Sequence, residues 1–166
     1  MDFTIRMSPP TWSEKLHGHE RFVTVLDGNG VLDRETGLVR VKKIWTAHDC
    51  GTVINPAGVE GQLEGSIHMG LGYTLSEQLV VENGKTLNTT LLDYKIPTAL
   101  DMPPGESVCI ETYEPEGPMG AKEAGEGLAS PTAPAIAEAV YHATDYRCKD
   151  LPITPEKVLK GMKKNR

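Results

Sequence analysis

A regular stripe of aliphatic side chains restricts what the segment 55–77 can form. Five such residues recur at every fourth position, the spacing of one face of a helix: Val59, Leu63, Ile67, Leu71 and Leu75. Asn55-Pro56 precedes the stripe and is a favourable helix start, because Asn can cap free N–H groups and Pro at the first position loses no hydrogen bond. We therefore predict one long helix with this face turned toward the core.

A second series on the same segment consists of glycines: Gly58, Gly61, Gly65 and Gly72. Each glycine inside a helix lowers helix stability by roughly 1 kcal/mol relative to alanine. A row of glycines therefore indicates a structural or functional requirement. Two interpretations stay open. Either the helix packs tightly against a neighbouring element, or another backbone or a large ligand approaches this side closely.

The predicted strands lie before and after this helix. Residues 21–26 and 38–47 are rich in Val, Ile, Thr and Trp, and turn residues at 27–30 and 35–37 separate them. They predict an antiparallel pair, with a bulge at Lys42-Lys43 where the alternation slips. A hairpin is expected over 79–87 because Asn83-Gly84 suits a type I′ turn, and a further strand is expected over 107–113.

Two more helices are predicted toward the C-terminus. Ser130-Pro131 starts one that runs to about Ala143, with Ile136 and Val140 facing inward, and Thr154-Pro155 starts a short one that ends near Gly161. Residues 1–20 show no sustained period and are expected to be irregular or a truncated element. The fold class is therefore α+β, a mixed and largely antiparallel sheet with about three helices.

The composition is that of an ordinary globular domain and excludes several partners. The chain has 166 residues, 39% of them hydrophobic and 24% charged, with a formal net charge of -6. A nucleic acid or an anionic membrane surface would require clustered Lys and Arg, so neither is expected as a partner. No apolar run reaches roughly 18 residues and no secretory signal is recognisable, which leads us to expect a cytoplasmic protein.

Cysteine and histidine give no metal motif. Cys50, Cys109 and Cys148 are odd in number and far apart, so we expect three reduced thiols rather than disulfides or a metal knuckle. The five histidines form no helix-spaced pair, and no protein metal ligand is predicted.

The most unusual stretch is the loop 117–127, which has four glycines in eleven residues. Such a loop can expose N–H donors to an anion, and it runs toward the start of the next helix. The carboxylates of Glu123 and Glu126 have two interpretations. Either they pair with Lys122 or lie in solvent, or one of them sits in a cleft with a raised pKa and serves as a general base.

Five blocks, in order, resemble the large subunit of molybdenum hydroxylases, the xanthine dehydrogenase and aldehyde oxidase family. They are residues 49–56 (DCGTVINP), 60–65 (EGQLEG) with 70–72 (GLG), 93–98 (DYKIPT), 120–126 (GAKEAGE) and 151–159 (LPITPEKVL). The similarity extends from about Leu32 to Leu159. It implies that residues 21–166 are part of the C-terminal, second molybdopterin-binding domain of that subunit.

The resemblance also implies roles for single residues. Gln62 matches a glutamine whose amide hydrogen-bonds the molybdopterin, and Glu126 matches the glutamate beside molybdenum that acts as catalytic base. Lys122, Ala124 and Gly125 fall in the loop that approaches this cofactor. Iron-sulfur clusters and FAD would be carried by other domains or subunits.

On this resemblance, the chain is expected to be a component of an oxidoreductase that hydroxylates an electron-poor carbon, on an aromatic or N-heterocyclic small molecule. Its partners would be the rest of the molybdenum subunit and the iron-sulfur and flavin subunits. Alone it is not expected to turn over, because family subunits are several times longer. The alternative is a non-catalytic relic or assembly module that packs on a partner without binding metal.

Overall fold

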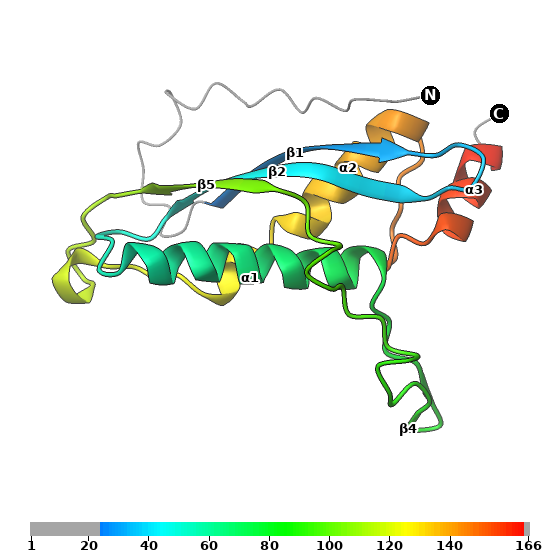
Figure 1. Ribbon diagram of the computed structural model, residues 1–166, viewed down its shortest axis with the longest axis horizontal. Helices are drawn as coiled ribbons and strands as arrows, with labels where there is room; N and C mark the ends of the chain where they lie inside the picture. Colours follow the sequence, from blue (N-terminus) through cyan, green and yellow to red (C-terminus); the bar gives the residue numbers. More distant parts are fainter. Residues whose placement is uncertain (1–23, 165–166) are drawn as a thin grey trace.

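The computed structural model describes residues 24–164, and within them the side chains of all but residues 24–29, 126 and 128 (Figure 1). The segment 1–20, predicted to be irregular, lies outside the described residues. A three-stranded sheet forms one layer, and helices pack against one of its faces. This arrangement confirms the predicted α+β class with a mixed sheet and three helices.

The sheet has the order β1-β2-β5 and consists of β1 (Thr24–Leu32), β2 (Val39–Asp49) and β5 (Gly105–Ile110). Strands β1 and β2 are antiparallel, as predicted, whereas β5 runs parallel to β2. The strand predicted over 107–113 is present but lies earlier in the chain. The long segment between β2 and β5 crosses over the sheet, and it contains the first helix.

The predicted bulge is confirmed, but the turn predicted at 27–30 is wrong. Asn29 pairs with Lys43 and Gly30 pairs with Val41, which leaves Lys42 as the extra residue. Residues 27–30 continue β1, because pairing with the long strand β2 overrides their turn chemistry. The chain reverses after Asp33, so the turn predicted at 35–37 is confirmed, and the carboxylate of Asp33 accepts a hydrogen bond from the N–H of Glu35 at 2.8 Å.

The three helices are α1 (Pro56–Leu75), α2 (Thr132–Thr144) and α3 (Pro155–Lys164). Helices α1 and α2 pack against the sheet, and α3 lies at its end, beside the connection between β1 and β2. The start of α1 is as predicted, since Asn55 Oδ1 accepts a hydrogen bond from the N–H of Gly58 at 3.1 Å. The inward stripe of α1 joins side chains of both other helices and of the sheet in the main core. The core residues are Leu32, Ile44, Ile67, Leu71, Ile136, Val140, Ile153 and Val158.

The start of α2 differs from the prediction that Ser130 caps it. A 3-10 turn, η2 (Glu126–Ala129), precedes the helix, and Ser130 follows this turn with helical angles, φ −58° and ψ −42°. An N-cap residue needs an extended backbone, so Ser130 cannot cap, and Pro131 occupies the cap position without a side-chain hydrogen bond. The start predicted for α3 is confirmed, because Thr154 Oγ1 accepts from the N–H of Lys157 at 3.4 Å.

The predicted hairpin is confirmed and projects from the body of the molecule (Figure 1). Its strands are β3 (Val81–Glu82) and β4 (Lys85–Thr86), joined by Asn83 and Gly84 with φ of 50° and 78°. Both positive angles are those that a type I′ turn needs. Within residues 24–164, no helix combines the length and the apolar character that a membrane crossing would require.

Candidate functional site

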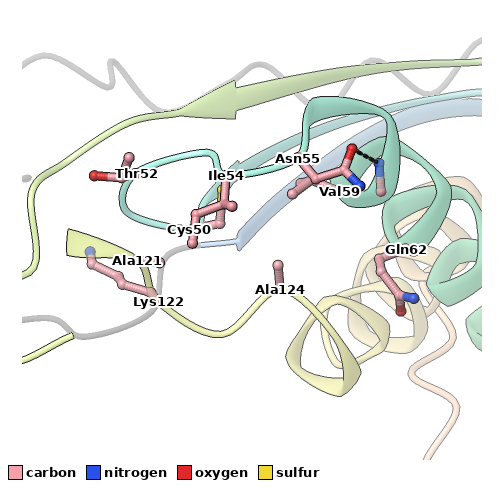
Figure 2. A pocket seen from close by; sticks show the side chains of 10 residues that line it. Cys50, Thr52, Ile54, Asn55, Val59, Gln62, Ala121, Lys122 and Ala124 are labelled. Atoms are coloured by element: carbon pink, nitrogen blue, oxygen red, sulfur yellow. Dashed lines mark hydrogen bonds between the residues drawn. The ribbon is translucent and has the colours of Figure 1, made fainter. Parts of the chain in front are cut away.

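A pocket of about 330 Å³ lies where the end of β2, the first turns of α1 and the glycine loop meet (Figure 2). It brings together two neighbouring sequence blocks, 49–56 and 60–65, and the distant block 120–126. The residues that line it are Cys50, Thr52, Ile54, Asn55, Gly58, Val59, Gln62, Ala121, Lys122 and Ala124. Three predicted site residues, Gln62, Lys122 and Ala124, are therefore together in one place.

The glycine loop is joined to the end of β2 by backbone pairing. The N–H of Thr52 donates to Gly120 O at 2.8 Å, and the N–H of Lys122 donates to Cys50 O at 2.7 Å. Gly51, with φ of 68°, allows this close approach, because a Cβ at that position would overlap the carbonyl oxygen of Gly120. One side of the pocket is thus built from two segments about 70 residues apart in sequence.

A buried ion pair reinforces the same junction. Lys122 Nζ lies 2.7 Å from Asp49 Oδ2, and the two side chains are only 8% and 9% exposed. Asp49 also accepts hydrogen bonds from Thr112 Oγ1 at 2.7 Å and from the N–H of Gly51 at 2.9 Å. Burial alone would disfavour the ionised carboxyl, but these hydrogen bonds outweigh it and hold the pKa of Asp49 below its ordinary value.

Glu123 has a role that neither sequence interpretation foresaw. Its carboxylate accepts hydrogen bonds from the N–H groups of Gly125 and Gly127. These two donors were expected to face a bound anion, but they bind a carboxylate of the loop itself. The carbonyl oxygen of Glu123 accepts from His48 Nε2 at 3.1 Å. The described partner of Lys122 is Asp49, so Glu123 does not form the pair with Lys122 that one of the two interpretations allowed.

Glu126, the predicted base, is the first residue of η2, and the structure describes its backbone alone. The backbone on either side of it is attached to α1. Ser66 Oγ donates to Gly125 O at 3.3 Å, and Tyr73 OH donates to Ala129 O at 3.0 Å. The predicted site residues Gly125 and Glu126 are therefore fixed between α1 and the end of β2.

The glycines of α1 divide between the two interpretations. A Cβ at Gly72 would overlap Glu77, so close packing explains that position, and the space beside Gly58 is filled by its own cap, Asn55. A Cβ at Gly61 or Gly65 would meet no atom within 4 Å. This open side of α1 flanks the exposed Gln62, so a large group or another chain segment has room to reach the helix backbone there.

The lining of the pocket offers polar side chains that could contact an organic cofactor. Within residues 24–164, no group of three or more His, Cys, Asp or Glu side chains is placed to bind a metal. The cysteines are free thiols as predicted, and burial, together with nearby Cys109 and acidic groups, raises the pKa of Cys50 in the pocket wall. The polar side chains of the lining are Thr52, Asn55, Gln62 and Lys122. Asn55 caps α1 and Lys122 pairs with Asp49, whereas the structure shows no partner for the side-chain amide of Gln62 among the described residues.

Sequence reasoning named Glu123 without its role as a cap, and it missed the other residues that hold the loop in place: His48, Asp49, Ser66 and Thr112. For Asp49 a signal existed, since it follows the strand-like segment 38–47 and opens the first block. The others gave none, because their partners are backbone groups or residues distant in sequence.

Three comparisons identify what this chain resembles. Residues 31–103 match the family model of a molybdopterin cofactor-binding domain. The chain is 39% identical over 122 residues to the xanthine dehydrogenase molybdenum-binding subunit of Escherichia coli O157:H7, covering 72% of this chain and 16% of that protein. It is 43% identical over 137 residues to the nicotine 6-hydroxylase large subunit of Paenarthrobacter nicotinovorans, covering 80% and 17% respectively.

The fold is also found in a solved structure. The crystal structure of quinoline 2-oxidoreductase from Pseudomonas putida 86 superposes with a TM-score of 0.75 at 36% identity, covering 83% of this chain and 18% of that chain. The chain thus spans about a sixth of the length of these relatives. The agreement covers both the sheet-and-helix fold and the sequence blocks that build the pocket.

Proposed function

Because this chain belongs to the molybdenum hydroxylase family and corresponds to part of its molybdopterin-binding large subunit, we propose that it forms one wall of the cofactor site. The observation that carries the proposal is the pocket in which Gln62 lies opposite the glycine loop, beside an open stretch of helix backbone. A flat, polar organic group of the size of a pterin can approach α1 closely where no side chain intervenes, within reach of the Gln62 amide.

Each predicted residue has a task in this proposal. The amide of Gln62 hydrogen-bonds the pterin, and the loop backbone at Ala124 and Gly125 lies against the cofactor. When bound, the molybdenum cofactor supplies a Lewis-acidic metal that acidifies water and accepts two electrons. Glu126 takes up the proton that the nucleophile releases, which is the work of a general base.

We propose an N-heterocyclic aromatic compound as the substrate class. Two relatives with substantial identity are named for nicotine and quinoline, and both molecules carry electron-poor carbon next to a ring nitrogen. Such a carbon accepts an oxygen nucleophile, in keeping with the base assigned to Glu126. The rest of the molybdenum subunit would provide most of the substrate pocket.

Gln62→Ala tests the cofactor contact. Loss of one hydrogen bond of about 1.4 kcal/mol should lower cofactor affinity about tenfold, so the complete molybdenum subunit should retain less molybdenum and pterin after dialysis. Gln78→Ala is the matched control, because Gln78 is exposed and lies outside the pocket.

Metal and pterin content per subunit, with hydroxylation of quinoline or nicotine, are the measurements. Equal cofactor content in the Gln62 and Gln78 variants would contradict the contact. A wild-type assembly that holds no molybdenum would instead establish the alternative, a non-catalytic module.

The projecting hairpin is our proposed contact with the rest of the molybdenum subunit. The hairpin and the turn that follows it, residues 79–92, carry exposed aliphatic side chains. Leu91 and Leu92 in the turn are 75% and 79% exposed, and Leu79, Val81 and Leu87 of the hairpin segment are also exposed. Exposed apolar residues gathered on one projection are typical of an interaction surface. In relatives about six times as long, the region that matches this chain is part of a larger subunit. We therefore expect part of its surface to be buried against the rest of the molybdenum subunit.

Leu91→Ser with Leu92→Ser should weaken this contact without unfolding the domain, because both side chains are already exposed. We expect reduced recovery of the assembled subunit when the two parts are co-expressed, with an unchanged far-ultraviolet circular dichroism spectrum. Met119→Ser, at a side chain of equal exposure in the glycine loop, is the control. Full recovery of the assembly with the double variant would exclude Leu91 and Leu92 as docking residues.

A further inference from the structure

We infer that Asp49 and Lys122 are a positioning pair, which holds the loop of Glu126 in its working place through a buried salt bridge rather than through contact with the cofactor. This inference rests on the proposed function of Glu126. It assigns to Lys122 a task different from the cofactor contact that the sequence suggests.

The ammonium group of Lys122 already has a fixed, buried partner. Its Nζ lies 2.7 Å from Asp49 Oδ2, and neither side chain is more than 9% exposed. Figure 2 shows its side chain extending away from Gln62, on the far side of the pocket from α1. Turning Lys122 toward a ligand would leave the Asp49 carboxylate buried without its counter-charge, which is strongly unfavourable.

Asp49 is itself held firmly enough to serve as an anchor. It ends β2, and its two carboxylate oxygens bind the N–H of Gly51, the hydroxyl of Thr112 and Lys122. Thr112 follows β5, so the anchor joins the ends of two paired strands. A loop tied to this point takes its position from the sheet.

Peptide bonds and hydrogen bonds together connect the pair to Glu126. The backbone N–H of Lys122 donates to Cys50 O, and the next residue, Glu123, is bound through its carbonyl by His48. The carboxylate of Glu123 then accepts from the N–H groups of Gly125 and Gly127, the two neighbours of Glu126. A displacement at Lys122 therefore reaches the base through bonded groups only.

The expected consequence of breaking the pair is a loss of rate without a loss of cofactor. General bases act only within hydrogen-bond reach, and a misplacement of about 1 Å can cost on the order of 10²-fold in rate. Removing either charge leaves the other buried and unpaired, which should loosen the loop. Removing both leaves a neutral junction, in which the side-chain amide introduced by Asp49→Asn could still accept from the N–H of Gly51.

The test is a double-mutant cycle of Asp49→Asn, Lys122→Met and the combined variant in the complete molybdenum subunit. We expect each single variant to lower kcat by about 10- to 100-fold at unchanged molybdenum content and KM. Each should also speed hydrogen exchange of the segment 117–129. The double variant should recover most of both losses, and it remains informative if a single variant fails to fold. Lys43→Met, in the surface pair with Glu106, is the control that should change neither.

A cofactor contact by Lys122 predicts a different pattern and would overturn the inference. Lys122→Met and the double variant would then lose molybdenum and rate equally, while Asp49→Asn would leave the loop's exchange unchanged. Additive losses would also refute the pair. If the proposed function is wrong, the wild-type subunit will contain no molybdenum. The pair can still be tested in that case, because hydrogen exchange of the loop can be measured whether or not metal is present.

Discussion

Glu126→Gln is expected to lower the kcat of the assembled enzyme by about 10²- to 10⁴-fold at unchanged molybdenum content. The amide keeps the size of the side chain but cannot take up a proton, so binding and folding should persist while proton removal from the nucleophile is lost. Single-turnover kinetics with an N-heterocyclic substrate and metal analysis of the same preparation provide the measurement.

The matched control for this variant is Glu116→Gln, at an exposed glutamate just before the same glycine loop. It changes the charge of the region equally and should leave kcat within about twofold, as expected for a surface substitution. If both variants kept the wild-type rate, a different residue would have to be the base. If Glu126→Gln lost its metal, Glu126 would be needed for cofactor retention instead.

Gly51→Ala is expected to destabilise the fold by about 3–4 kcal/mol, the largest effect we predict on stability. Alanine at a positive φ costs roughly 1–2 kcal/mol. The added Cβ would also overlap Gly120 O and force apart the two backbone hydrogen bonds that join β2 to the glycine loop, each worth about 1 kcal/mol. Urea unfolding followed by tryptophan fluorescence, to which Trp45 on β2 contributes, would measure the loss.

Gly84→Ala separates the two contributions to that loss. Gly84 has a similar φ of 78°, but no atom lies within 4 Å of an added Cβ. This variant should therefore show only the backbone cost of roughly 1–2 kcal/mol. Equal losses at Gly51 and Gly84 would mean that the junction between β2 and the loop contributes nothing to stability.

Much of the fold could be predicted from local patterns in the sequence. The stripe from Val59 to Leu75 predicted α1, and Asn83-Gly84 predicted the hairpin, because both depend on residues close together in the chain. The turn predicted at 27–30 was wrong because strand pairing with β2 outweighed local turn chemistry. Likewise, the cap at Ser130 was wrong because the preceding η2 turn had already made its backbone helical.

Single residues of the site could be predicted from the sequence, but the contacts between them could not. The sequence blocks placed Gln62, Lys122 and Ala124 among the site residues, and the structure gathers these three at one pocket. The bond between Asp49 and Lys122 spans 73 positions, and no periodicity or capping rule relates residues so far apart. The use of Glu123 as a cap for Gly125 and Gly127 depends on backbone geometry that the sequence does not specify.

The parallel pairing of β2 with β5 has a consequence for the order in which the molecule folds. The two strands cannot meet until the whole segment 50–104, including α1, has returned across the sheet. Closing so long a loop loses chain entropy before the new contacts compensate, which slows the step. Because Thr112 and the glycine loop follow β5, the wall of the pocket is completed late, after helix α1 and the antiparallel strands have provided a surface on which it can assemble.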